Sequence, residues 1–181
     1  RCYGLASGVI WRASLVCAFA MEMLAEHTHR SQDTAYTLGL LHAVGMIVIS
    51  HEMEAENLSR PLLGNPFESG LGERERERFG HDHAEIGAEL LKFWEFPESM
   101  IESVRFQLNP THCKTTPKWA CLLALARWVR NRICAETSWG DPEPPDPFLL
   151  KLAALDEEEL NQISVVAEER LDAAESLAAG W

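Results

Sequence analysis

The sequence predicts an all-α protein, a compact helical bundle of about six to eight helices. Apolar residues recur every three to four positions along most of the chain, and helix start signals precede most of these segments. No segment alternates apolar and polar residues between hairpin turns. The 181 residues, 46% of them hydrophobic and 24% charged, suffice for one packed core. We therefore expect a single helical domain over residues 1–181.

The first predicted helix spans about Ser7 to Glu26, with Ser7 as its N-cap. Its apolar stripe has helical spacing and consists of Ile10, Ala13, Cys17, Ala20, Met21 and Leu24. A second helix is predicted over Asp33 to Glu52, with His42 on its apolar face. Its interior glycines, Gly39 and Gly45, each cost about 1 kcal/mol relative to alanine, so we expect another element to pack closely against them.

The middle of the chain begins with a loop rich in proline and glycine, between residues 61 and 72. The following run, Glu73 to Arg78, alternates acidic and basic residues and is interpreted as a solvent-exposed face. Asp82 and Glu85 form a capping-box pattern that predicts a helix ending near Trp94. One face of that helix carries His83, Gly87, Leu90, Leu91 and Trp94.

Proline in the first turn predicts two further helices, starting at Pro97 and Pro117. The second is long and apolar and continues to about Ala135. Three basic residues in its last turns complement the helix dipole: Arg127, Arg130 and Arg132. Residues 140–147 contain four prolines and predict a stiff loop before an acidic C-terminal segment, whose helix starts with a D-x-x-E pattern at Asp156.

The composition argues against nucleic-acid binding and against membrane insertion. The chain has 28 acidic and 16 basic residues, a net charge of -12, so its surface repels nucleic-acid phosphates and anionic lipid. No apolar run approaches the roughly 20 uncharged residues that span a bilayer. The cysteines form no C-x-x-C pair, which favours buried thiols in a reducing compartment, and the cytoplasm is the expected location. They are Cys2, Cys17, Cys113, Cys121 and Cys134.

Histidines are the main candidates for chemistry. His42 stands inside an apolar helix, where imidazole could ligate a metal or move protons, although a single such histidine is more often structural. Two H-x-H pairs, His27 with His29 and His81 with His83, would need further ligands to hold a metal. The sequence contains no phosphate-binding glycine loop, nucleophile elbow or H-E-x-x-H motif.

Three segments carry a family resemblance: Trp11 to Ser14, Leu38 to Gly45 and Phe79 to Glu98. The first is similar to a W-R-H-S stretch, the second to G-L-L-H-D-I-G, and the third to G-x-D-H-A-E-V-G-A-x-L-L-x-x-W-x-L-P. In this order they resemble HDOD domains, the non-catalytic bacterial relatives of HD-type metal-dependent phosphohydrolases. The resemblance covers about Trp11 to Leu108 and implies an HD-like helical fold.

The resemblance also implies that the metal site of the catalytic relatives is largely lost. Those enzymes hold a divalent metal with a His, a His-Asp pair and a later Asp. The matching positions here are Ala13, His42 and Ala43, and Phe106-Gln107 stands in the family's H-H-x-P segment. The helix from Lys118 to Arg132 contains no Asp. We therefore expect no catalytic residue, no metal and no cofactor. A remnant pocket with ligand-binding residues is expected at His42, His83 and Gly87.

The function implied by the resemblance is a non-enzymatic signal-transduction or regulatory module of the bacterial cytoplasm. Its expected partner is a protein of a signalling pathway or a small ligand, not nucleic acid or membrane, and a homodimer is a further option. One alternative is a metal-dependent phosphohydrolase with a rebuilt site. That site would use His42, His81, His83 and Glu85. The other alternative is a structural or dimerisation role for the final helix and Trp181. Because the family usually has a further helical lobe before Trp11, we expect a fragment or a shortened member.

Overall fold

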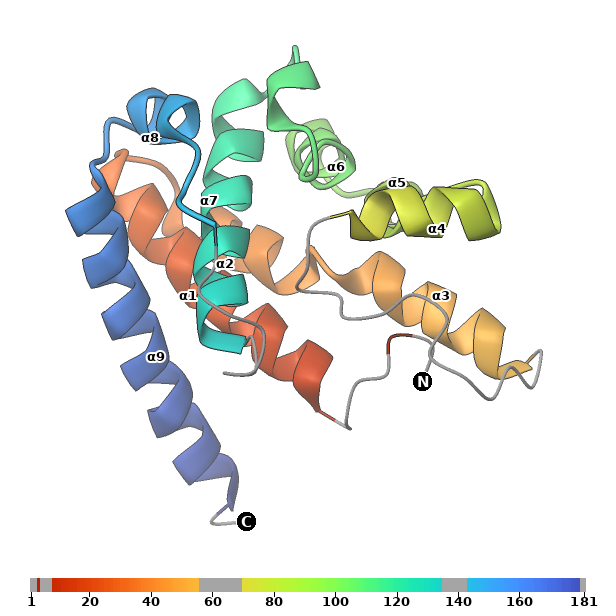
Figure 1. Cartoon of the computed structure of the whole chain (residues 1–181), viewed down its shortest axis with the longest axis horizontal. Coiled ribbons are helices and arrows are strands. Elements are labelled where there is room, and N and C mark those ends of the chain that lie inside the picture. The colour runs from red at the N-terminus through yellow and green to blue at the C-terminus, as the bar shows by residue number, and fades with distance from the viewer. Residues whose placement is uncertain (1–2, 4–7, 56–69, 135–142, 180–181) are drawn as a thin grey trace.

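A computed structural model describes residues 3, 8–55, 70–134 and 143–179 of the chain (Figure 1). Most of these residues are helical and none of them lies in a strand, which confirms the all-α prediction. The helices are α1 (Val9–His27), α2 (Gln32–Leu41), α3 (Val44–Ala55), α4 (Leu71–Phe79), α5 (His83–Phe93), α6 (Glu98–Arg105), η1 (Pro110–His112), α7 (Pro117–Cys134), α8 (Pro147–Ala153) and α9 (Glu157–Ala179). Several predicted features lie outside the described residues: Cys2, the cap at Ser7, most of the loop between residues 61 and 72, residues 140–142 of the proline-rich loop, and Trp181.

Helix α1 is the centre of the main core. It packs against α2, α7 and α9, and in Figure 1 it lies between α9 on one side and α2 with α7 on the other. The predicted stripe is only part of its buried surface, because every residue from Ala13 to Met21 is buried. A helix that is apolar on all sides belongs in a protein interior. A second, smaller core joins α3 to α4 and contains Tyr3, Ala43, Met46, Ile49, Met53 and Leu71.

The prediction of one helix from Asp33 to Glu52 is wrong, because the chain breaks at His42 and Ala43 into α2 and α3. At this break, side-chain nitrogens form hydrogen bonds with backbone carbonyl groups. His42 Nδ1 donates to the Gly39 carbonyl at 2.6 Å, and Gln107 Nε2 donates to the His42 carbonyl at 2.9 Å. These bonds replace part of the continuous backbone pattern that one long helix would need.

Both glycines of this segment lie at close helix contacts, as predicted. A Cβ atom on Gly39 would lie 2.6 Å from Ala18 Cα of α1. A Cβ atom on Gly45 would overlap the backbone carbonyl oxygen of His83 on α5. Glycine therefore allows α2 to approach α1, and α3 to approach α5, at backbone distance.

Local start signals locate most of the other helices. The capping box at Asp82 is present, with Glu85 N donating to Asp82 Oδ1 at 2.8 Å. The same pair of bonds starts α9 at Asp156 and Glu159. Helix α8 was not predicted, although Asp146 caps it by accepting from Phe148 N at 2.8 Å. The prolines of residues 140–147 were interpreted only as loop signals, and Pro147 in fact opens this helix.

One described stretch, Gln32–Met53, is apolar and long enough to cross a membrane, contrary to the sequence expectation. It consists of the two helices α2 and α3, and 44% of its most apolar window is buried inside the fold. A core helix of a folded domain has the same composition.

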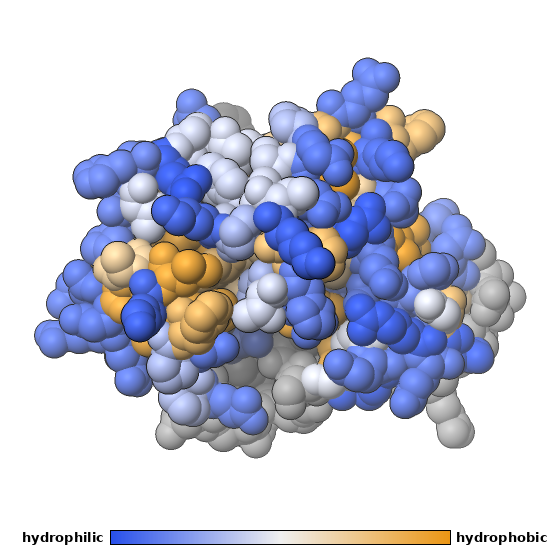
Figure 2. All heavy atoms as spheres, turned by 90° about the horizontal axis from the view of Figure 1, so that it is seen from above, coloured by the Kyte–Doolittle hydropathy of each residue, from blue (hydrophilic) through white to orange (hydrophobic). Residues whose placement is uncertain are grey.

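The face of the molecule seen in Figure 2 is mainly hydrophilic, with apolar patches between polar side chains, as the net charge of -12 leads one to expect. Among the described residues, five large apolar side chains are more than half exposed: Ile47, Phe93, Phe148, Val165 and Leu177.

Candidate functional site

His42 lies fully buried at the junction of α2 and α3, and both of its ring nitrogens have partners. Nδ1 lies 2.6 Å from the Gly39 carbonyl oxygen, and Nε2 lies 2.8 Å from Arg130 Nη1. A guanidinium can only donate hydrogen bonds, so Nε2 is the accepting nitrogen and Nδ1 carries the proton. This assignment, made from the hydrogen-bond pattern, gives a neutral imidazole in one fixed tautomer.

Arg130 belongs to α7 and is only 2% exposed, so beyond its predicted place in the last turns of the helix it is part of the protein interior. Its Nε and Nη2 atoms donate to Asn131 Oδ1 at 3.0 and 2.6 Å. Burial lowers the pKa of Arg130. The sequence contained a signal for this position, because Leu123, Ala126 and Arg130 share the buried face of the helix at spacings of three and four.

A second arginine of α7 extends the same network. Arg127 Nη1 donates to the Gln107 backbone carbonyl at 2.6 Å, and Gln107 in turn bonds the His42 carbonyl. Burial and the nearby Arg130 lower the pKa of Arg127 to about 9. Gln107 is completely buried, at the segment where the family usually has histidines. Helix α7 therefore holds the His42 ring directly through Arg130, and it holds the His42 backbone indirectly through Arg127 and Gln107.

Burial, and secondarily the positive charge of Arg130, lowers the pKa of His42 well below its ordinary value of 6.5. The unfolded chain then binds a proton near pH 6.5 that the folded chain does not bind. Folding stability should therefore fall as the pH drops below 6.5, by at most about 1.4 kcal/mol per pH unit from this residue.

Urea unfolding at several pH values measures this loss, and NMR should show that the His42 ring is still neutral at pH 6.5. A His42 ring that protonates near pH 6.5 would contradict the neutral, fixed imidazole.

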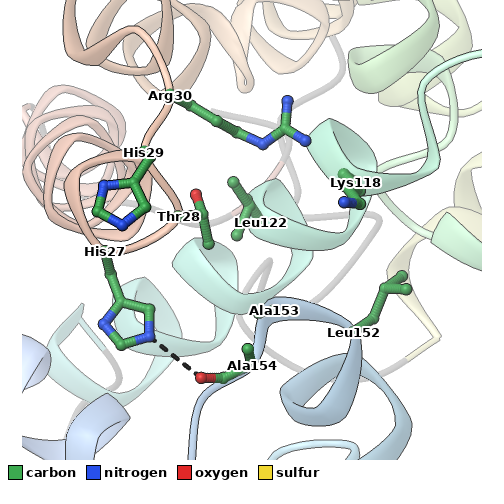
Figure 3. A pocket seen from close by; sticks show the side chains of 9 residues that line it. All are labelled: His27, Thr28, His29, Arg30, Lys118, Leu122, Leu152, Ala153 and Ala154. Atoms are coloured by element: carbon green, nitrogen blue, oxygen red, sulfur yellow. Dashed lines mark hydrogen bonds between the residues drawn. The ribbon is translucent and has the colours of Figure 1, made fainter.

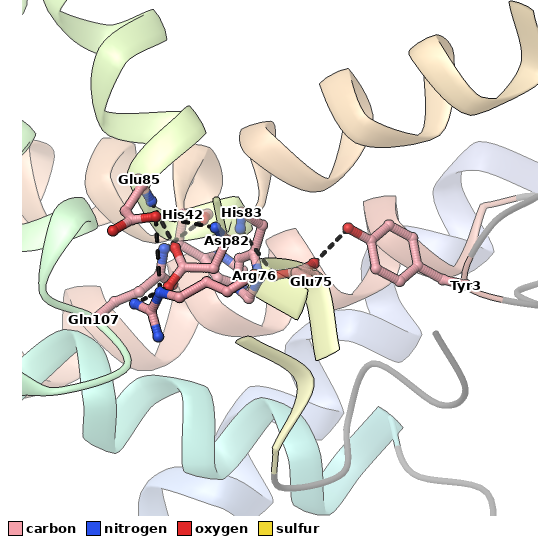
Figure 4. A network of polar contacts seen from close by, with 8 residues as sticks. All are labelled: Tyr3, His42, Glu75, Arg76, Asp82, His83, Glu85 and Gln107. Atoms are coloured by element: carbon pink, nitrogen blue, oxygen red, sulfur yellow. Dashed lines mark hydrogen bonds and ion pairs between the residues drawn. The ribbon is translucent and has the colours of Figure 1, made fainter. Parts of the chain in front are cut away.

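His83 is held by a buried carboxylate from α4 (Figure 4). Glu75 Oε2 accepts from the backbone N–H of His83 at 2.8 Å and lies 2.6 Å from its Nδ1 atom. Glu75 Oε1 accepts from the Tyr3 hydroxyl at 2.6 Å. The interpretation of Glu73 to Arg78 as an exposed face is therefore wrong for Glu75, which is 0% exposed. Burial raises its pKa, but the bonds from His83 and Tyr3 outweigh this and lower the pKa below 4.5.

Gly87 lies on α5 where this helix crosses α3. A Cβ atom on Gly87 would lie 3.3 Å from Val104 Cγ1 and 3.4 Å from Gly45 N. The structure thus brings His42, His83 and Gly87 to one region, where the start of α5 meets the junction of α2 and α3. Ligand binding by these three residues stays a prediction.

The four residues of the rebuilt metal site do not come together as one group. The His81 side chain is 70% exposed and pairs with Glu85 at 3.5 Å, whereas His83 is bound to Glu75. Glu85 Oε2 accepts from the Asp82 backbone at 3.1 Å. In the part of the chain that the structure describes, no three His, Cys, Asp or Glu side chains are grouped as potential metal ligands.

Comparison with solved structures places the chain among proteins with this helical fold. A candidate signal transduction protein from Marinobacter aquaeolei VT8 matches 97% of the chain with a TM-score of 0.77 and 22% identity. A candidate phosphohydrolase from Shewanella amazonensis matches 94% (TM-score 0.61, 21% identity, 66% of that chain). A response regulator from Methylococcus capsulatus matches 90% (TM-score 0.62, 24% identity, 62% of that chain).

Sequence comparison gives the family. An uncharacterised protein from Treponema pallidum (strain Nichols) is 32% identical over 88 residues, which is 43% of this chain. The chain spans 15% of the Treponema protein and 39% of the Marinobacter protein. The family model for the HDOD domain matches residues 3–110, which include the α2–α3 junction, α4 and the capped start of α5. Since this match covers more than half of the sequence, the chain belongs to the HDOD family, which is related to the HD phosphohydrolases.

Proposed function

We propose that the chain is a regulatory module that binds a protein partner or a small ligand and does not hydrolyse phosphoesters. The contact between His42 Nε2 and Arg130 carries this proposal. In a metal site this nitrogen would face the cation, and here it accepts a hydrogen bond from a buried, positively charged side chain. A divalent cation at the same position would be repelled by the guanidinium and would lack the imidazole ligand at Ala13 and the carboxylate ligand at Ala43.

The regulatory role is supported by the family and by the kinds of protein that share the fold, a signal transduction protein and a response regulator. In our proposal the chain works in the bacterial cytoplasm and transmits a signal by contact. His42 and His83 would then have a structural role, holding the helices that form the partner-binding surface. Their side chains are 0% and 1% exposed, so a ligand that touches them would first have to separate the helices.

An assay of hydrolysis tests the proposal directly. Purified protein should not release product from p-nitrophenyl phosphate, ATP or a cyclic dinucleotide above the buffer rate, with Mn²⁺, Mg²⁺ or Fe²⁺ added. The His42→Asn variant should give the same baseline, and so should His112→Asn, which changes an exposed histidine.

Turnover that needs Mn²⁺, disappears with a chelator and is lost in His42→Asn but kept in His112→Asn would overturn the proposal. Circular dichroism of each variant establishes that it is folded before the rates are compared. Metal analysis of the same samples adds an independent result, because a working metal site should retain close to one equivalent.

A further inference from the structure

A pocket of about 260 Å³ opens where the end of α1, the first turn of α7 and the end of α8 meet (Figure 3). The end of α1 and the turn after it contribute the residues from His27 to Arg30, helix α7 contributes Lys118 and Leu122, and α8 contributes Leu152. None of these residues belongs to the network around His42. The pocket is thus a separate feature of the fold.

The side chains around this pocket are basic. Arg30, Lys118, His27 and His29 line it, and no carboxylate does. Among the described residues, no salt bridge involves Arg30 or Lys118. Figure 3 shows Arg30 extending toward the side of the pocket where Lys118 stands. In a chain with a net charge of -12, two neighbouring cations without a carboxylate leave positive charge available to a ligand.

Two basic side chains of the lining are held by contacts within the protein. The Arg30 guanidinium lies 5.2 Å from the centre of the Trp119 ring, in a cation–π contact. His27 Nε2 lies 3.1 Å from the Ala154 carbonyl oxygen and links α1 to the end of α8. A binding site whose side chains are already held loses less conformational entropy when a ligand binds.

The helix ends at the pocket add partial backbone charges to those of the side chains. Two helices end at the pocket, and free carbonyl groups there would repel an anion. The last-turn carbonyls of α1 accept instead from the backbone N–H groups that follow them: Leu24, Ala25 and Glu26. The Ala154 carbonyl is bonded to His27. Lys118, by contrast, stands in the first turn of α7, where the helix carries partial positive charge.

We propose that this pocket binds a small phosphate monoester, with the phosphate group between Arg30 and Lys118. The organic part would rest on the apolar side of the pocket, at Leu122 and Leu152. The volume of 260 Å³ lies just below the roughly 300 to 1,000 Å³ of drug-sized ligand sites, which suits a compact ligand. An adjoining groove is lined by Glu26 among others, so an extended polyanion would meet repulsion.

Calorimetric titration of the whole chain with phenyl phosphate, inorganic phosphate and benzoate tests this site. We expect saturable binding that is tightest for phenyl phosphate, weaker for inorganic phosphate and weakest for benzoate. Arg30→Gln and Lys118→Gln should each weaken phenyl phosphate binding by about tenfold or more, because each removes a charged donor. Lys92→Gln, an exposed lysine of α5, is the matched control and should bind as the wild type does.

NMR of the histidine rings locates the binding. Phenyl phosphate should shift the Cε1–H signals of His27 and His29 and leave that of His112 unchanged. Absence of saturable binding, equal affinity in the Lys118→Gln variant, or benzoate binding as tight as phenyl phosphate would each overturn the proposal. Lys118 is exposed, so its substitution leaves the fold intact and the result does not depend on the Arg30 variant. The proposed regulatory function does not depend on this outcome, nor this site on the outcome of the hydrolysis assay.

Discussion

Replacement of Gly45 by alanine should lower the free energy of unfolding by about 3 kcal/mol or more. The added Cβ atom would overlap the carbonyl oxygen of His83 and lie 2.7 Å from Gly87 N. Both are backbone atoms, which cannot rotate away as a side chain can, so α3 and α5 would have to separate. A domain of this kind has about 5 to 15 kcal/mol of stability in total, and the loss is a large part of it.

Gly87→Ala is the matched control on the other side of the same helix crossing. Its Cβ atom would lie 3.3 Å from Val104 Cγ1, a side-chain atom that can shift, and alanine is the better helix former. We expect a change of less than about 1 kcal/mol for this variant. Urea unfolding followed by circular dichroism measures both values. Equal midpoints for the two variants would mean that the α3–α5 contact is looser than described.

Glu75→Gln should cost about 3 kcal/mol, the second largest effect. The carboxylate accepts three hydrogen bonds in a fully buried site, two from His83 and one from Tyr3. An amide has only one accepting oxygen, so its NH₂ group would face a donor of His83 or Tyr3, and a buried polar group would lose its partner. Glu77→Gln changes an exposed residue of the same helix and should stay within about 0.5 kcal/mol of the wild type.

The pH dependence of the same variant gives an independent check. The pKa of Glu75 is lowered below 4.5 in the folded protein, so its contribution to stability is complete above pH 4.5. The contribution is lost as the pH falls through the lowered folded value. The wild type should therefore lose its advantage over Glu75→Gln below pH 4.5. A difference between the two proteins that stays constant down to pH 3 would contradict the buried carboxylate.

Helix starts could be predicted because their signals are local. Asp82 with Glu85, and Asp156 with Glu159, act through bonds between residues three positions apart. The break at His42 was not predicted because it depends on Gln107, which is 65 positions away. No pattern within a helix-length window contains that contact. Burial of charged residues is equally non-local, since Glu75 requires both His83 and Tyr3, the latter 72 positions earlier.

The candidate site was predicted in part. The family resemblance identified His42 and its missing partners Ala13 and Ala43, but not the residue that now faces the ring. Arg130 was assigned to the helix dipole together with Arg132, which is exposed. The position of Arg130 on the apolar face of the helix distinguishes it from Arg132. A charged residue at a buried position needs a partner inside the fold.

The contact between Arg130 and His42 has a consequence for how the protein responds to its surroundings. A metal ion must be acquired from the cell, competes with other metals and can be removed by a chelator. The guanidinium is made with the chain and is present in every folded copy. In the proposed function, the charge beside His42 therefore comes from the chain itself, and neither metal scarcity nor metal excess in the cell changes it.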